Sequence, residues 1–306
     1  MFEPDSKKCC TAMAILLGVL AATAESAVAF QVEIRPAHAQ FEIPDQVSVE
    51  EGTIRLPDGG ELGYWDTGGD GETLVLLHPA SMSRAAWPFQ QPIFANAGYR
   101  VIGYSRRGYI GSTNPSKPSF AADDLNHLFE QVDVERAHIV AAAHGGSYAV
   151  DFALSYPEKV RSLSLASSLI GIDEREYVSM LNRLLPRSFS QLPRDFRELG
   201  PAYRAENPAG AAEWNRIAGR SRNKGTFSLQ ARRNRVVYQS LRSIEVPVLI
   251  VGGEADLYAP APLLRLQAAN FPNANLELIR EAGHSAYWER PEMFNNVVLR
   301  FLETVN

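Results

Sequence analysis

Residues 138–160 have the sequence HIVAAAHGGSYAVDFALSYPEKV, and this stretch is the strongest local indication of the fold class. It starts as a short apolar run, passes two glycines and continues with apolar residues at helical spacing up to a Tyr-Pro pair. This pattern predicts a buried strand, a tight turn and a helix. Strand patterns alternate with helical patterns on both sides of it, which is typical of the α/β class, a mostly parallel sheet covered by helices on both faces.

Residues 168–243 interrupt this alternation, because they contain mainly helical and loop patterns. Strand patterns flank them, VRSLSLAS before and VPVLIVGG after. We therefore expect a mainly helical cap, inserted into an α/β core of residues 50–167 and 244–306. In open α/β sheets, ligands bind beyond the carboxyl ends of the strands, which is where such a cap would lie.

Residues 1–29 have the pattern of a signal peptide. Lys7 and Lys8 precede an apolar run over residues 11–24, and small residues with an Ala-x-Ala site close the segment. A second Ala-x-Ala at residues 37–39 leaves the cleavage position open, and an uncleaved anchor or a misassigned start is the alternative. We expect an exported protein, periplasmic or secreted, with no stable membrane association once the signal is cleaved.

The composition argues against several kinds of partner. A net charge of −5 with 21% charged residues gives no reason to expect nucleic-acid binding. Both cysteines, Cys9 and Cys10, precede the apolar run and would leave with the signal peptide, so the mature chain would hold no disulfide and no thiolate-bound metal. A small-molecule substrate is the partner that we expect.

Two segments near the C-terminus carry chemistry. EAGHSAYWERPEMF places His284 in a loop between the last strand pattern and the last helical pattern. VPVLIVGGEADLYAPAP ends a buried strand pattern shortly before Asp256, with Glu254 two residues earlier. An acid at a strand end can accept the imidazole N–H, which fixes the tautomer and stabilises the imidazolium.

Together these segments and residues 138–160 resemble the α/β-hydrolase-fold superfamily of esterases and lipases. The resemblance covers residues 50–167 and 244–304 and leaves the cap unmatched. That superfamily places a nucleophile on a strained strand-to-helix turn, followed in the chain by an acid and a histidine. The resemblance implies that His284 is the catalytic histidine and that Asp256, in preference to Glu254, orients it. It implies no metal and no organic cofactor.

The resemblance also implies an oxyanion hole. LLHPASMS, residues 76–83, corresponds to the superfamily's segment after the third strand, with Pro79 in place of a glycine. Because proline has no N–H, the donor there would be Ala80, with Ser81 as the alternative. The second donor would be the N–H that follows the turn, which is that of His144.

The turn itself departs from the superfamily pattern. Ala141 and Gly145 fill the two flanking small positions, and Ala143 stands at the nucleophile position. An alanine cannot be acylated. Ser147 would serve as the nucleophile only if the turn moved by one helical turn, which would place two glycines in the strand; Ser81 is a further candidate replacement.

These residues leave three functional hypotheses open. The favoured one is a hydrolase, similar to carboxylic-ester hydrolases, that cleaves a small ester or a related acyl or C–C bond at a site whose serine is replaced by Ala143, either deliberately or by native loss. The second is general-base catalysis by His284 and Asp256 without an acyl-enzyme, of the lyase or cofactor-free oxygenase type. The third is a ligand-binding relative without turnover.

The cap sequence is strongly basic. Between Leu181 and Ser243 there are twelve arginines and Lys224 against four acidic residues, in a chain whose total charge is −5. Solvated helix faces with surface ion pairs are one interpretation of this excess. The other is that arginines such as those in QARRNR attract a substrate that bears a carboxylate.

Overall fold

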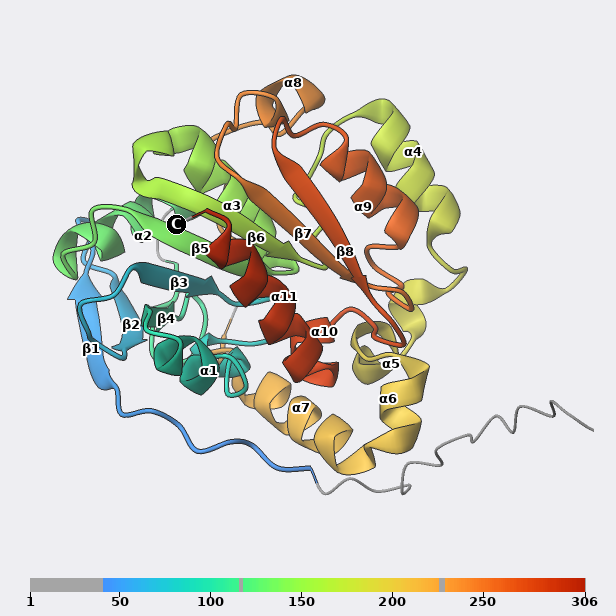
Figure 1. Ribbon diagram of the computed structural model, residues 1–306, viewed down its shortest axis with the longest axis horizontal. Helices are drawn as coiled ribbons and strands as arrows, with labels where there is room; N and C mark the ends of the chain where they lie inside the picture. The colour runs from blue at the N-terminus through green and yellow to red at the C-terminus, as the bar shows by residue number, and fades with distance from the viewer. Residues whose placement is uncertain (1–40, 116–117, 226–228, 306) are drawn as a thin grey trace, which may run out of the picture. The chain divides into compact units, whose positions relative to one another are not determined.

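The computed structural model describes residues 41–115, 118–225 and 229–305. Within these residues an eight-stranded sheet has the order β1-β2-β4-β3-β5-β6-β7-β8 (Figure 1). Strand β1 pairs antiparallel with β2, and β2 with β4, whereas all pairs from β4 to β8 are parallel. The mostly parallel α/β sheet expected from the sequence is therefore confirmed. The strands are β1 Glu50–Arg55, β2 Glu61–Asp66, β3 Thr73–Leu77, β4 Arg100–Tyr104, β5 Ala137–Ala142, β6 Val160–Ala166, β7 Val248–Gly253 and β8 Ala274–Ile279.

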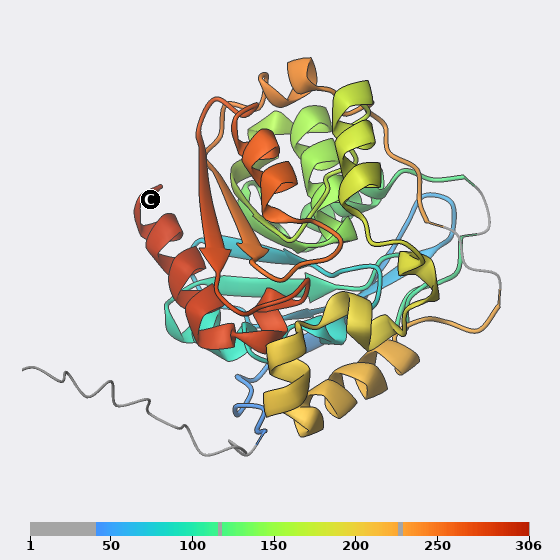
Figure 2. The same ribbon diagram turned by 90° about the vertical axis from the view of Figure 1, so that its right-hand side faces the viewer.

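Helices cover both faces of the sheet (Figures 1 and 2). In the chain they lie mainly between consecutive strands and after β8. Those outside the β6–β7 connection are α1 Gln91–Asn96, α2 Ala121–Gln131, α3 His144–Ser155, α9 Ala261–Ala268, α10 Ala286–Glu289 and α11 Pro291–Glu303. Within the connection are α4 Arg175–Leu184, α5 Arg194–Glu198, α6 Pro201–Glu206, α7 Pro208–Arg220 and α8 Tyr238–Leu241.

The parallel strands contribute side chains to two separate hydrophobic cores, because successive side chains of a strand point to opposite faces of the sheet. In β3, Val75 and Leu77 belong to the core that contains α2, α3 and α9, whereas Leu74 and Leu76 belong to the core that contains α1, α10 and α11. Burial on both faces explains why these strands are continuous apolar runs in the sequence instead of alternating ones.

The segment between β6 and β7 contributes to both cores. Tyr177 of α4 and Leu241 of α8 are buried with α3 and α9. Tyr203 of α6 and Trp214 of α7 are buried on the opposite face, where the indole N–H of Trp288 in α10 donates to the carbonyl oxygen of Gly210 in α7 at 3.3 Å. Figure 2 shows α6 and α7 beside α10, and Figure 1 shows α4 beside α9. The short helix α5 lies in the chain between α4 and α6. The cap that we expect over residues 168–243 remains a prediction.

The sequence predictions for the N-terminal segment lie outside the described residues. The signal peptide over residues 1–29, its cleavage position and the export that depends on it remain predictions. In the part of the chain that the structure describes, no helix is long and apolar enough to cross a bilayer.

Candidate active site

The turn after β5 is strained. Ala143 has φ 49° and ψ −119°, a backbone conformation that costs a residue with a side chain about 1–3 kcal/mol. The helix α3 begins directly after it, close to the end of β3. A Cβ placed on Gly145 would lie 2.4 Å from the carbonyl oxygen of Leu77, and one on Gly146 would lie 2.4 Å from the hydroxyl oxygen of Ser168. The two glycines therefore permit the close contact that holds the turn in place.

The strain at this turn gives a prediction for stability. Ala143→Gly should raise the free energy of unfolding by about 1 kcal/mol, because relief of the positive φ outweighs the higher chain entropy that glycine brings to the unfolded state. The matched control is Ala142→Gly in the fully buried strand β5, which should lower stability. Urea denaturation of both variants measures the difference. A destabilised Ala143→Gly protein would contradict the strain assigned to the turn.

His284 and Asp256 form a buried hydrogen-bonded pair. Nδ1 of His284 lies 3.0 Å from Oδ1 and 2.9 Å from Oδ2 of Asp256. Because a carboxylate only accepts, the proton sits on Nδ1, and Nε2 is left to accept one. The backbone N–H groups of Tyr258 and Ala259 also donate to Asp256 Oδ1, at 2.7 and 3.0 Å. Glu254, the alternative acid, is solvent-exposed and makes no hydrogen bond to His284.

The surroundings of His284 favour its protonated form. Burial lowers the pKa of the imidazole, but the carboxylate of Asp256, with smaller contributions from Glu198 and Glu289, more than offsets this and raises the pKa above its ordinary value. The ring of Tyr258 packs on the imidazole with centroids 4.4 Å apart. The histidine is thus held in one orientation and tuned to be a stronger base than a free imidazole.

A second carboxyl group braces the histidine loop. Glu289 Oε2 accepts hydrogen bonds from the backbone N–H of Gly283, at 2.9 Å, and from that of Gly200 in the cap, at 2.8 Å. Burial raises the pKa of Glu289 to about 7, although these two backbone donors oppose the shift. Glu289 therefore ties the residue before His284 to the start of α6.

The predicted oxyanion donors lie on the same cavity. Among the described residues, the N–H groups of Ala80 and His144 have no hydrogen-bond acceptor. Arg106 stabilises the loop that contains Ala80. Its guanidinium donates hydrogen bonds to the carbonyl oxygen of His78 and, at 3.2 Å, to that of Pro79. His78 accepts the backbone N–H of Arg106 at Nε2 and contacts the carbonyl oxygen of Pro79 through Nδ1, so its role is to brace the loop.

The side chain of His144 differs from that of His284. Burial, together with the charges of Arg106 and Arg232, lowers the pKa of His144 to about 4. Its ring meets that of Tyr148 edge to face, with centroids 4.8 Å apart. His144 is therefore neutral at physiological pH, and its backbone N–H is the group that can bind negative charge.

These groups surround one cavity of about 230 Å³. The structure brings together at this cavity every predicted site residue except Asp256, which contacts His284 and does not line the cavity. Besides the apolar Leu169, the sequence did not point to three polar residues of the lining, Ser167, Glu198 and Tyr258. The lining residues are Ala80, Ser81, Ala143, His144, Ser147, Ser167, Leu169, Glu198, Tyr258 and His284.

Partial signals for the missed residues exist in the sequence. Ser167 follows the apolar strand pattern of β6, and Tyr258 follows Asp256 by two positions, so both lie where strands of a parallel sheet end. Glu198 has no such signal, because it belongs to the cap segment that carries no recognisable motif.

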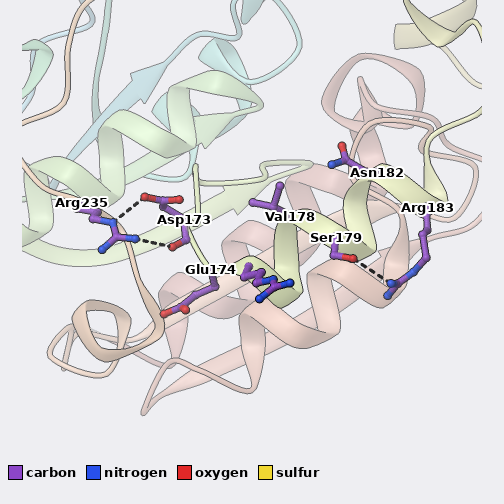
Figure 3. A pocket seen from close by; sticks show the side chains of 8 residues that line it. Asp173, Glu174, Val178, Ser179, Asn182, Arg183 and Arg235 are labelled. Carbon is purple, nitrogen blue, oxygen red and sulfur yellow. Dashed lines mark hydrogen bonds and ion pairs between the residues drawn. The ribbon is translucent and has the colours of Figure 1, made fainter.

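A larger hollow lies elsewhere on the surface. It measures about 720 Å³ and is formed by α4 and the chain before it, with Arg235 (Figure 3). Arg235 donates to Asp173 at 2.6 Å and Arg183 to Ser179 at 3.0 Å, so polar groups of this hollow bind one another. It contains no histidine and no carboxylate paired with one, and it therefore offers no comparable chemistry.

The basic residues of the cap do not line the cavity. Arg216 pairs with Glu213 at 2.6 Å, and Arg233 pairs with Asp123 of α2. These contacts agree with solvated faces that carry ion pairs. Attraction of a carboxylate-bearing substrate by the cap remains a prediction.

Comparisons with known proteins agree with this geometry. The sequence profile described as the Alpha/beta hydrolase family matches residues 74–297. The chain is 32% identical over 270 residues to a 2-hydroxy-6-oxononadienedioate/2-hydroxy-6-oxononatrienedioate hydrolase of Burkholderia vietnamiensis (strain G4 / LMG 22486), covering 81% of this chain and 93% of that protein. It is 29% identical over 286 residues to a protein of the same name from Paraburkholderia phymatum (strain DSM 17167 / CIP 108236 / LMG 21445 / STM815), covering 87% and 97%.

Solved structures show the same fold. A hydrolase from Pseudomonas aeruginosa PA01 matches with a TM-score of 0.69 and 24% identity, over 82% of this chain and 98% of that one. A bromoperoxidase from Bacillus anthracis matches with a TM-score of 0.68 and 21% identity, over 83% and 100%. The sheet order, the strained turn and the family profile point to one conclusion, which confirms the fold expected from the sequence: the chain belongs to the alpha/beta hydrolase family.

Proposed function

We propose that this chain hydrolyses a small ester or oxo acid by general-base catalysis, with water as the nucleophile and no acyl-enzyme. The observation that carries the proposal is the buried His284–Asp256 pair on a cavity whose strained turn presents Ala143. The proposed base contacts its proposed orienting acid, both proposed N–H donors belong to residues that line the cavity, and Ala143 carries no oxygen that could be acylated.

The proposed reaction uses each group once. Nε2 of His284 takes a proton from water while the water oxygen bonds to the substrate carbonyl carbon. The carbonyl oxygen becomes an oxyanion, which the N–H groups of Ala80 and His144 stabilise. Asp256 stays ionised and stabilises the imidazolium. The intermediate then collapses and the bond to the leaving group breaks. Over the whole turnover the proton that water gave to Nε2 of His284 is balanced by the proton that the leaving group takes from the site, so His284 is neutral again at the end.

The size of the cavity limits the substrate. A volume of about 230 Å³ lies below the ~300–1,000 Å³ of ordinary ligand pockets, so we propose a substrate of few heavy atoms. The relatives at 32% and 29% identity are named as hydrolases of 2-hydroxy-6-oxononadienedioate and 2-hydroxy-6-oxononatrienedioate, and these names support a substrate that contains an oxo group.

The time course and pH dependence of turnover test this proposal. With p-nitrophenyl acetate, the unmodified chain should release nitrophenol linearly from the start, and mass spectrometry should find no acetylated protein. Because His284 accepts a proton only when neutral and its pKa is raised, kcat/KM should climb with pH through a midpoint above about 6.5. The groups that face the imidazole and set this midpoint are Asp256, Glu198 and Glu289.

Two results would contradict the proposal. A rapid initial burst with an acetyl group on Ser81 or Ser147 would show that one of these serines replaces the missing nucleophile. If no turnover is found, or if the turnover is unchanged in His284→Ala, the result would favour the third hypothesis, a relative that binds a ligand without converting it.

A further inference from the structure

Glu198 is a buried carboxyl group beside the proposed base. It ends α5, and its backbone carbonyl oxygen accepts the N–H of Ser285, the residue after His284, at 2.9 Å. Its side chain lines the same cavity as His284 and Ala143, with the residue 8% exposed. Within the part of the chain that the structure describes, its Oε2 is buried and has no hydrogen-bond partner. A buried carboxyl oxygen left in this state is costly, by about 1–3 kcal/mol or more.

Two hydroxyl groups on the same cavity are also buried without a hydrogen-bond partner. Ser81, in the loop after β3, and Ser167, directly after β6, have buried Oγ atoms without a hydrogen-bond partner among the described residues. Buried polar groups are ordinarily satisfied, so these three groups around one cavity are available to bind a polar ligand there. The three come from separate segments, one of them in the cap.

Glu198 forms no ion pair within the described residues, although Arg197 is its neighbour in the chain. Arg197 directs its guanidinium over the rings of Phe189 and Tyr258. Burial raises the pKa of Glu198; His284, Arg197 and Arg194 oppose this, and Asp256 adds to it, with a net rise. Glu198 therefore holds a proton more readily than an exposed glutamate.

We propose that Glu198 is a second catalytic group, a general acid that protonates the leaving atom while His284 activates water. This proposal rests on the proposed function and names its substrate class, which is esters whose leaving group departs poorly as an anion. A base and an acid that meet at one cavity, each tuned by its surroundings, are the arrangement that such a bond requires.

The proton balance closes over one turnover. Water gives one proton to Nε2 of His284 and its oxygen to the carbonyl carbon. When the intermediate collapses, the bond from carbon to the alkoxide oxygen breaks, and that oxygen takes the proton of Glu198. The products are a carboxylic acid and an alcohol, with an imidazolium and a carboxylate left on the protein. Transfer of the proton from His284 back to Glu198 through water restores the starting state.

A comparison of two esters with the same acyl group tests this role. p-Nitrophenyl acetate has a leaving group that needs no proton, whereas ethyl acetate has one that does. Glu198→Gln keeps the shape and polarity of the side chain but cannot release a proton. We expect it to lower kcat/KM for ethyl acetate about 100-fold or more, with a loss for p-nitrophenyl acetate at least ten times smaller. Glu176→Gln, at an exposed glutamate of α4 in the same cap, is the matched control and should change neither rate.

Each other outcome overturns the role of Glu198. Equal losses on the two esters would show that Glu198 only positions the site. An unchanged rate on ethyl acetate, or an unmodified chain that cleaves p-nitrophenyl acetate through His284 but not ethyl acetate, would show that it supplies no proton, while the proposed function stands. Failure of the unmodified chain on both esters would contradict both proposals.

Discussion

Ala143→Ser is expected to open a covalent route to ester hydrolysis and to raise kcat for p-nitrophenyl acetate at least about 100-fold. The serine Oγ would be attached to a Cβ that already stands on the strained turn, on the cavity that His284 lines. The base that would take its proton and the N–H groups of Ala80 and His144 that would bind the oxyanion are present in the unmodified chain. The substitution therefore has to add only the Oγ atom of residue 143.

Kinetics and mass spectrometry together measure this gain. The variant should show an initial burst of nitrophenol and an acetyl group on residue 143, both of which disappear when His284→Ala is added. Ala142→Ser, one residue earlier in the fully buried end of β5, is the matched control and should gain nothing. A correctly folded but inactive Ala143→Ser protein would contradict the assignment of the turn.

Asp256→Asn should lower the His284-dependent rate of the unmodified chain by about 10³- to 10⁴-fold. The carboxylate fixes the proton on Nδ1 through contacts of 2.9 and 3.0 Å, whereas an asparagine can donate its own N–H to Nδ1 and so stabilise the wrong tautomer. The amide oxygen can still accept the N–H groups of Tyr258 and Ala259, so the fold should be kept.

The pH profile separates this effect from general damage. Loss of the carboxylate removes the charge that raises the pKa of His284, so the remaining activity should reach its midpoint at a lower pH than in the unmodified chain. Glu254→Gln is the control, because this glutamate is exposed and makes no hydrogen bond to the imidazole. A large loss in Glu254→Gln, with Asp256→Asn nearly unchanged, would reverse the assignment of the acid.

The features that could be predicted from the amino-acid sequence are those that depend on neighbours in the chain. Apolar runs such as residues 73–77 alternate with helical patterns, and this local periodicity is enough to predict a mostly parallel sheet with helices on both faces. The glycines after Ala143 and the loop around His284 are short local motifs, so the resemblance to the α/β-hydrolase-fold superfamily could locate the turn and the histidine from the sequence. The end of a buried strand pattern offered both Glu254 and Asp256, and the resemblance to the α/β-hydrolase-fold superfamily favoured Asp256.

The residues that face the turn and the histidine loop across the cavity could be identified only from the tertiary structure. Glu198 is one of several charged residues in a cap segment without a recognisable pattern, and nothing in its neighbours indicates that it is buried beside His284. The same holds for the unsatisfied hydroxyl groups of Ser81 and Ser167. Burial and hydrogen-bond satisfaction depend on how α5, the loop after β3 and the end of β6 pack together. These segments are distant in the chain, and periodicity and spacing report only on residues that are close in it.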